Sequence, residues 1–141
     1  MQETKNEPKS FVAPSTGPAV SERILVAEDN SGIKLMVSKF LEFIGFEVAL
    51  ASDGLEALSL FLKTSFDLVL TDLEMPFMDG WTLTSRIKER SPYTPVVLMT
   101  GSDRETILRN GETWPFDSVI FKPFALEDLQ KTVQSALELR R

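Results

Sequence analysis

Carboxylates stand where apolar runs of this sequence end. Segment 67–76, DLVLTDLEMP, is an apolar run that stops at Asp72, with Glu74 two residues later. The apolar segment 23–27, RILVA, stops at the adjacent pair Glu28-Asp29. Single acids at such places can cap turns or favour the start of a helix. Several acids brought together repel one another unless a cation lies among them, so their chemistry depends on whether the fold gathers them.

Five short apolar runs alternate with five helical patterns along the chain. The runs predict strands over 23–27, 46–51, 67–72, 96–100 and 118–121. The patterns predict helices over about 31–45, 53–63, 80–90 and 102–111, and a last helix from 126. Leu55, Leu58 and Leu62 are expected to form the buried face of the second helix. The alternation predicts an α/β fold, a single doubly wound (βα)5 domain whose parallel sheet carries helices on both faces.

In such a sheet the carboxyl ends of the strands form the ligand crevice. Glu28, Asp29 and Asp72 would meet there, and oxygen ligands of this kind suit Mg²⁺. Two other strand ends add the hydroxyl of Thr100 and the ammonium of Lys122. Metal, ammonium, hydroxyl and carboxylate together suit phosphoryl transfer, with a carboxylate as nucleophile. Taken singly, these acids can be helix-start residues and Thr100 an ordinary strand end, whereas Lys122 within FKPF has no evident structural purpose.

Composition limits the alternatives. The chain has 141 residues, a net charge of −6, no cysteine and no histidine. These counts exclude thiolate chemistry, histidine bases and histidine-bound metals, and they disfavour direct binding to nucleic acid or an acidic membrane. No apolar run approaches the roughly 18 residues of a membrane span, and the start is not a secretory signal. We expect a cytoplasmic protein with a disordered lead or linker over 1–22 and one domain over 23–141.

The motifs LVAEDN, LVLTDLEMPFMDG, VVLMTGS and FKPF resemble those of response-regulator receiver domains, the phosphoacceptor modules of two-component signalling. The resemblance implies the strand order 2-1-3-4-5. It implies Asp72 as phosphoacceptor, with Lys122 and Thr100 contacting the phosphoryl group. It also implies Mg²⁺ held by Glu28, Asp29, Asp72 and the backbone carbonyl of Glu74, and a cis peptide at Lys122-Pro123.

Two positions depart from the family pattern. Val119 stands where an aromatic residue is common, and Ala125 stands where a helix cap is expected. The position of Glu74 commonly tunes dephosphorylation in this family, so the lifetime of the phosphoryl group is not predicted.

The resemblance implies a phosphorylation switch rather than an enzyme. Its partners would be a sensor histidine kinase or histidine phosphotransfer protein as donor, and a protein target for output. Because no output domain follows the last predicted helix, output would pass through another protein, or the chain is a piece of a larger hybrid kinase. Two alternatives are a Mg²⁺-dependent phosphohydrolase with an Asp nucleophile and a docking module that is never phosphorylated.

Overall fold

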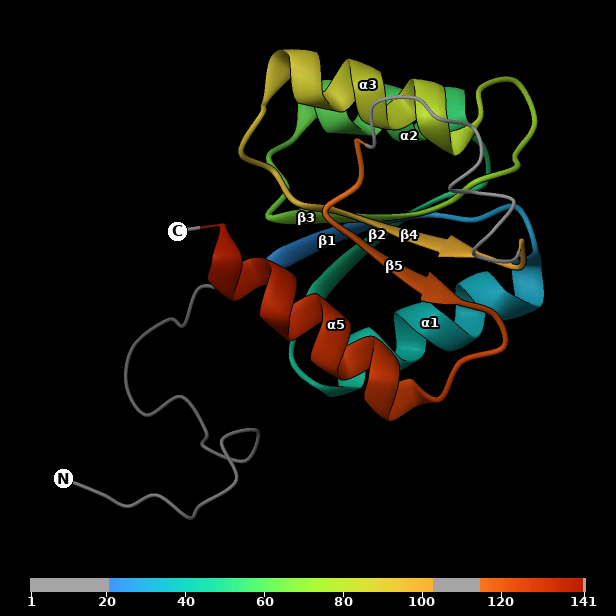
Figure 1. The fold of residues 1–141 in the computed structure, drawn as a ribbon, viewed down its shortest axis with the longest axis vertical. Helices are drawn as coiled ribbons and strands as arrows, with labels where there is room; N and C mark the ends of the chain where they lie inside the picture. Colours follow the sequence, from blue (N-terminus) through green and yellow to red (C-terminus); the bar gives the residue numbers. More distant parts are fainter. Residues whose placement is uncertain (1–20, 103–114, 141) are drawn as a thin grey trace, which may run out of the picture.

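The computed structural model of the protein describes residues 21–102 and 115–140 (Figure 1). Within them the chain alternates between strands and helices, as the sequence predicts. The strands are β1 (Arg23–Ala27), β2 (Glu47–Ala51), β3 (Leu68–Asp72), β4 (Val96–Thr100) and β5 (Ser118–Phe121). The helices of the described residues are α1 (Ser31–Phe43), α2 (Gly54–Lys63), α3 (Gly80–Arg90) and α5 (Leu126–Leu139).

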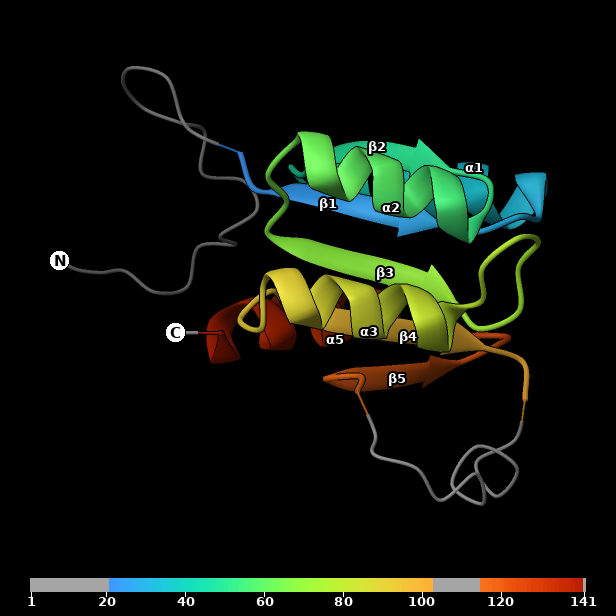
Figure 2. The ribbon, with the colours of Figure 1, turned by 90° about the horizontal axis from the view of Figure 1, so that it is seen from above.

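The five strands form one parallel sheet in the order β2-β1-β3-β4-β5, which confirms the predicted topology. Helices α1 and α5 cover one face, and α2 and α3 cover the other (Figures 1 and 2). The helix predicted over 102–111 and the predicted lead lie outside the described residues, except at their edges. No helix of the described part is long and apolar enough to cross a membrane.

Strand side chains alternate between two apolar cores because successive residues point to opposite faces of a sheet. In β1, Ile24 and Val26 pack with α1 and α5, whereas Leu25 and Ala27 pack toward α2 and α3. Both sets are fully buried. A strand buried on both faces reads as a continuous apolar run, which is why these strands were recognisable in the sequence.

Three helices begin at a side-chain cap. Asn30, Asp53 and Asp79 precede α1, α2 and α3, and each side chain accepts a hydrogen bond from a backbone N–H of the first turn. Ala125 precedes α5 and makes no side-chain cap, as the sequence predicts. All four helix starts follow the carboxyl ends of strands, so the caps also shape the loops at that end of the sheet.

The buried face of α2 differs from the prediction. Leu55 and Leu62 are 51% and 49% exposed, and only Leu58 of the expected face packs against the core. The helix instead rests on Gly54 and Ala57, which are buried. A Cβ on Gly54 would lie 2.0 Å from the carbonyl oxygen of Met78, so the loop after β3 presses on the start of the helix. With Gly54 and Ala57 on the buried side of α2, Leu55 and Leu62 are left half exposed to solvent.

Candidate functional site

Parallel pairing gathers the predicted residues at the carboxyl end of the sheet. Ala27 at the end of β1 is in register with Thr71 of β3, so Glu28 and Asp29 emerge beside Asp72. Thr100, which ends β4, is in register with Phe121, the residue before Lys122. The sequence alone predicted that these strand ends would converge, and the order of the sheet confirms it.

The three acids form a compact cluster. Glu28, Asp29 and Asp72 each offer a carboxylate oxygen, and these oxygens lie within 4.8 Å of one another. Glu28 is 1% exposed and the Asp72 side chain 13%, whereas Asp29 is open to solvent. Unpaired carboxylates at this spacing repel one another, and hard cations such as Mg²⁺ prefer oxygen ligands. The donor set therefore fits a divalent cation.

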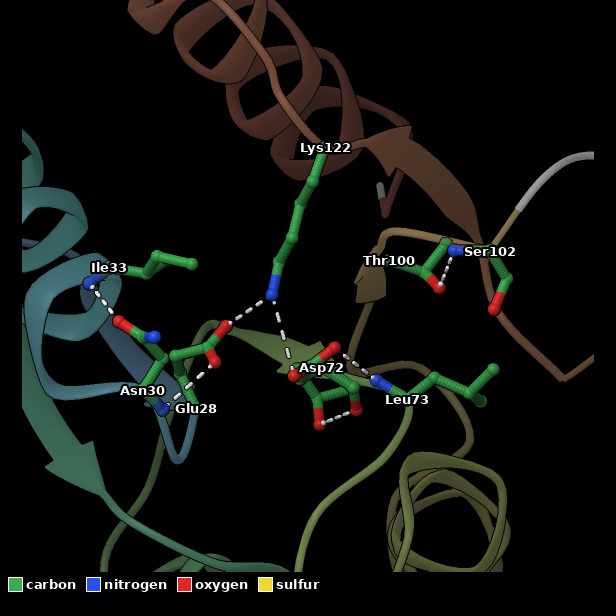
Figure 3. Close-up of polar contacts among 9 residues, drawn as sticks. Glu28, Asn30, Ile33, Asp72, Leu73, Thr100, Ser102 and Lys122 are labelled. Carbon is green, nitrogen blue, oxygen red and sulfur yellow. Dashed lines mark hydrogen bonds and ion pairs between the residues drawn. The ribbon is translucent and has the colours of Figure 1, made fainter.

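Lys122 supplies the positive charge that faces this cluster (Figure 3). Its Nζ lies 2.9 Å from Oε1 of Glu28 and 3.4 Å from Oδ2 of Asp72. The peptide bond between Lys122 and Pro123 is cis, as the resemblance implied. One ammonium thus bridges the buried acid at the end of β1 and the acid at the end of β3.

Both carboxylate oxygens of Glu28, a predicted Mg²⁺ ligand, accept hydrogen bonds within the protein. Its Oε1 accepts the bond from Lys122, and its Oε2 accepts one from the backbone N–H of Asn30 at 3.1 Å. The side chain of Asn30 in turn caps α1 by accepting from Ile33 N at 2.9 Å. Sequence reasoning did not single out Asn30, although an asparagine directly before a helical pattern is a recognised cap signal. Asn30 therefore links the helix start to the acid cluster.

The Asp72 carboxyl is harder to ionise than an ordinary aspartate. Burial and the nearby charge of Glu28 raise its pKa from 3.8 to about 6, against the opposing effects of Lys122 and of the Leu73 N–H bond. Burial by itself would lower the pKa of Lys122, but its hydrogen bond to Glu28 and the charges of Asp72 and Glu28 leave that pKa raised. A largely buried acid with a raised pKa, paired with a lysine, is the pattern expected of a functional site.

Two predicted residues lie at the margin of this cluster. Thr100 is buried, and its Oγ1 accepts a hydrogen bond from Ser102 N at 3.1 Å, so the hydroxyl engages the loop that follows β4. Glu74 is exposed in the loop after β3. Figure 3 shows Lys122 reaching toward Glu28 and Asp72, while Thr100 stands apart from these contacts.

Curated relatives share most of this chain. Regulatory protein AtoC of Escherichia coli is 39% identical over 119 residues, which cover 84% of this chain and 26% of AtoC. Sensor histidine kinase RcsC of Escherichia coli is 31% identical over 139 residues, which cover 93% of this chain and 14% of RcsC. The chain therefore spans only a minor part of either relative.

Two solved structures align with this chain over nearly their whole length. Chemotaxis protein CheY4 of Vibrio cholerae has a TM-score of 0.77 at 31% identity, covering 83% of this chain and 99% of its own. Response regulator TrrA of Thermotoga maritima, solved in complex with Mg(2+)-BeF, has a TM-score of 0.76 at 28% identity, covering 82% and 98%. Residues 24–134 match the family described as response regulator receiver domain. Sequence, sheet order and family match agree, and the chain belongs to the receiver-domain family of response regulators.

Proposed function

We propose that this domain is a phosphorylation switch in which Asp72 accepts a phosphoryl group. The observation that carries the proposal is the placement of Asp72 at the end of β3, within 4.8 Å of two further acids and 3.4 Å from the Lys122 ammonium. A receiver domain implies signalling through a phosphorylated aspartate and is generally a regulator module rather than an enzyme. The domain assists only its own phosphoryl transfer and dephosphorylation.

The transfer step needs a phosphohistidine donor outside this chain, because the 141 residues of the chain include no histidine. An Asp72 oxygen attacks the phosphorus of a phosphohistidine, a P–O bond forms as the P–N bond breaks, and the freed imidazole nitrogen takes up a proton. The product on this chain is an acyl phosphate. The donor is a sensor histidine kinase or a histidine phosphotransfer protein; the receiver family implies such a partner, and RcsC is a kinase among the relatives.

The remaining site residues act by charge and position. Lys122 pairs with the incoming phosphoryl oxygens, and Thr100 donates its hydroxyl to them after leaving its present bond to the following loop. Glu28, Asp29, Asp72 and the backbone carbonyl of Glu74 would hold Mg²⁺, which supplies neutralising charge for the phosphoryl oxygens when bound. The compact oxygen cluster supports this assignment, as does the Mg(2+)-BeF complex of TrrA.

Phosphorylation changes the surface offered to a protein target. Movement of Thr100 toward the phosphoryl group would release the Ser102 N–H and so alter the segment that follows β4. A ligand shifts such an equilibrium only by its different affinity for the two states, and the new phosphoryl contacts of Thr100 and Lys122 supply that difference.

Intact mass spectrometry tests the assignment. Wild-type protein incubated with MgCl₂ and acetyl phosphate should gain one phosphoryl group, and Asp72→Asn should gain none. Asp53→Asn is the matched control, because it changes another aspartate at the same end of the sheet while an asparagine can keep the cap on α2. Labelling of Asp72→Asn at the wild-type rate would overturn the assignment of the acceptor.

A further inference from the structure

The loop between β3 and α3 packs tightly against the end of β3, beside Asp72. A Cβ on Gly80 would lie 2.3 Å from the carbonyl oxygen of Asp72, and Gly80 N donates to Leu73 O at 2.7 Å. Farther up the loop, Met78 presses on Gly54 at the start of α2. At both Gly80 and Gly54 the neighbouring backbone lies too close for a residue with a side chain. The path of the loop is therefore fixed by packing on two sides.

Phe77, the residue directly before Met78 in this loop, has an unfavourable backbone conformation. Its φ is 69°, and it is the one residue other than glycine with positive φ in the part of the chain that the structure describes. Met78 N donates to Pro76 O at 2.7 Å, which closes a γ-turn centred on Phe77. The γ-turn with positive φ at its centre is rare and strained, and glycine or asparagine adopts such a φ more readily.

The Phe77 ring does not compensate for this strain by burial. It is 80% exposed, whereas Met75 and Met78 on either side of it pack against the apolar core below α2 and α3. The chain thus places a large apolar ring in solvent at a position where a smaller residue would fit the backbone better. Strained positions that gain nothing in folding are found preferentially at functional sites.

The position of the loop identifies what the ring can meet. Figure 2 shows the loop after β3 at the end of the sheet to which the strand arrows point, where Asp72 lies. The Asp72 side chain is only 13% exposed, so a protein that brings a phosphohistidine to it must rest on the surrounding loops. Exposed aromatic rings are common anchors in protein interfaces. A small phosphodonor needs no such contact.

Building on the proposed function, we propose that the Phe77 ring is a recognition contact for the protein that presents the phosphohistidine to Asp72. The partner chemistry is an apolar patch beside the partner's histidine. Phe77 takes no part in bond making, so it affects how well the protein donor binds and leaves the reactivity of Asp72 unchanged.

The test compares two donors that carry the same P–N bond. One is phosphoramidate, which has no protein surface. The other is the phosphorylated histidine kinase or histidine phosphotransfer protein that labels wild-type protein fastest in a panel of both kinds from the source organism. Phe77→Gly and Phe77→Asn remove the ring and suit the turn, so their denaturation midpoints should equal or exceed that of the wild type. Phe43→Asn is the matched control, since Phe43 is 86% exposed at the end of α1, next to the opposite end of the sheet.

The expected result separates the donors. With limiting protein donor, both Phe77 variants should be labelled about tenfold more slowly than wild type, the loss typical of one interface anchor. The loss should shrink at saturating protein donor, labelling by phosphoramidate should be unchanged, and Phe43→Asn should behave as wild type. Equal slowing with both donors, no slowing with the protein donor, or no protein donor in the panel labelling wild type would each overturn the proposal. Wild type that phosphoramidate fails to label on Asp72 would instead refute the proposed function.

Discussion

The acids at the two ends of the sheet differ in the number of hydrogen-bond and ion-pair partners available to them. At the amino end, Asp67 accepts from Arg23 N at 2.7 Å and from the Arg140 guanidinium at 3.1 Å. Asp117 accepts from Val96 N and from Lys88 Nζ, each at 2.7 Å. At the carboxyl end, Glu28 and Asp72 share the ammonium of Lys122, and Asp29 lies in the same cluster of acids. Asp67 and Asp117 thus each pair with a cation and with a backbone N–H, and the other guanidinium nitrogen of Arg140 contacts Glu22.

This difference separates stability from function. The acids at the amino end hold the starts of strands and the end of α5 in place through hydrogen bonds and ion pairs. At the carboxyl end, burial and the nearby charge of Glu28 raise the pKa of Asp72 to about 6, so ionisation of Asp72 opposes the fold. Acids at the strand ends of one sheet can therefore stabilise the fold or form a reactive site, depending on their burial and on the partners available to them.

Asp117→Ala should produce the largest loss of stability. It leaves the buried Val96 N–H without its acceptor and Lys88 without its anion. Hydrogen bonds to charged groups contribute about 1.5–3 kcal/mol, and we expect a loss of about 2 kcal/mol in the free energy of unfolding. Urea denaturation at neutral pH measures it. Asp117→Asn keeps one acceptor oxygen and should lose less; an unchanged midpoint in both variants would show that this end is not stabilised by its acids.

Asp72→Asn should change stability in the opposite direction. Because the folded pKa of about 6 exceeds the ordinary value of 3.8, the folded state holds the proton more tightly. Wild-type stability therefore falls as pH rises from about 4 to about 6, whereas asparagine cannot ionise. Without divalent ions we expect the variant to be about 1–2 kcal/mol more stable at pH 8, after allowance for partial solvent screening.

Unfolding curves at several pH values check this expectation. The difference between Asp72→Asn and wild type should vanish near pH 3.5, grow through the interval set by the two pKa values, and then level off. MgCl₂ should narrow it at pH 8, because the cation would stabilise the wild-type site more. A variant less stable than wild type at pH 8 would contradict the comparison between the two ends.

Strand positions were predictable from sequence because each strand is a short, mostly apolar run. β1, β4 and β5 have the predicted bounds, and β2 and β3 begin only one residue later, at Glu47 and Leu68. The face of α2 was not predictable, since its buried side is formed by the small residues Gly54 and Ala57, and Gly54 packs against Met78, which is distant in sequence. Periodicity reports that a helix has an apolar side, but contacts with other segments decide how much of that side is buried.

The members of the site were predictable but their pairing was not. Each of Glu28, Asp29, Asp72, Thr100 and Lys122 ends or follows a strand, and parallel order suffices to bring such residues together. Lys122 lies closer to Glu28 than to Asp72, although Glu28 is 94 residues away in the sequence. This preference depends on the conformations of the side chains, which the sequence pattern does not report. The strain at Phe77 likewise had no signal in composition or periodicity, because it arises from packing on both sides of the loop.

The smallest expected effect concerns the start of α5, which also lies at the carboxyl end of the sheet. Ala125 has φ −83° and ψ 148°, the extended conformation of a capping residue, yet its side chain accepts nothing. Ala125→Ser or Ala125→Asp should therefore supply an acceptor without moving the backbone and raise the free energy of unfolding by about 0.5–1 kcal/mol. Asp53→Ala, which removes an existing cap from α2, is the matched reverse change and should lower it by a similar amount. Urea midpoints that stay at the wild-type value in both Ala125 variants, while Asp53→Ala shifts, would mean that backbone groups at the start of α5 are already satisfied by water. In that case the carboxyl end of the sheet would be weakened only at its acids, and not at its uncapped helix.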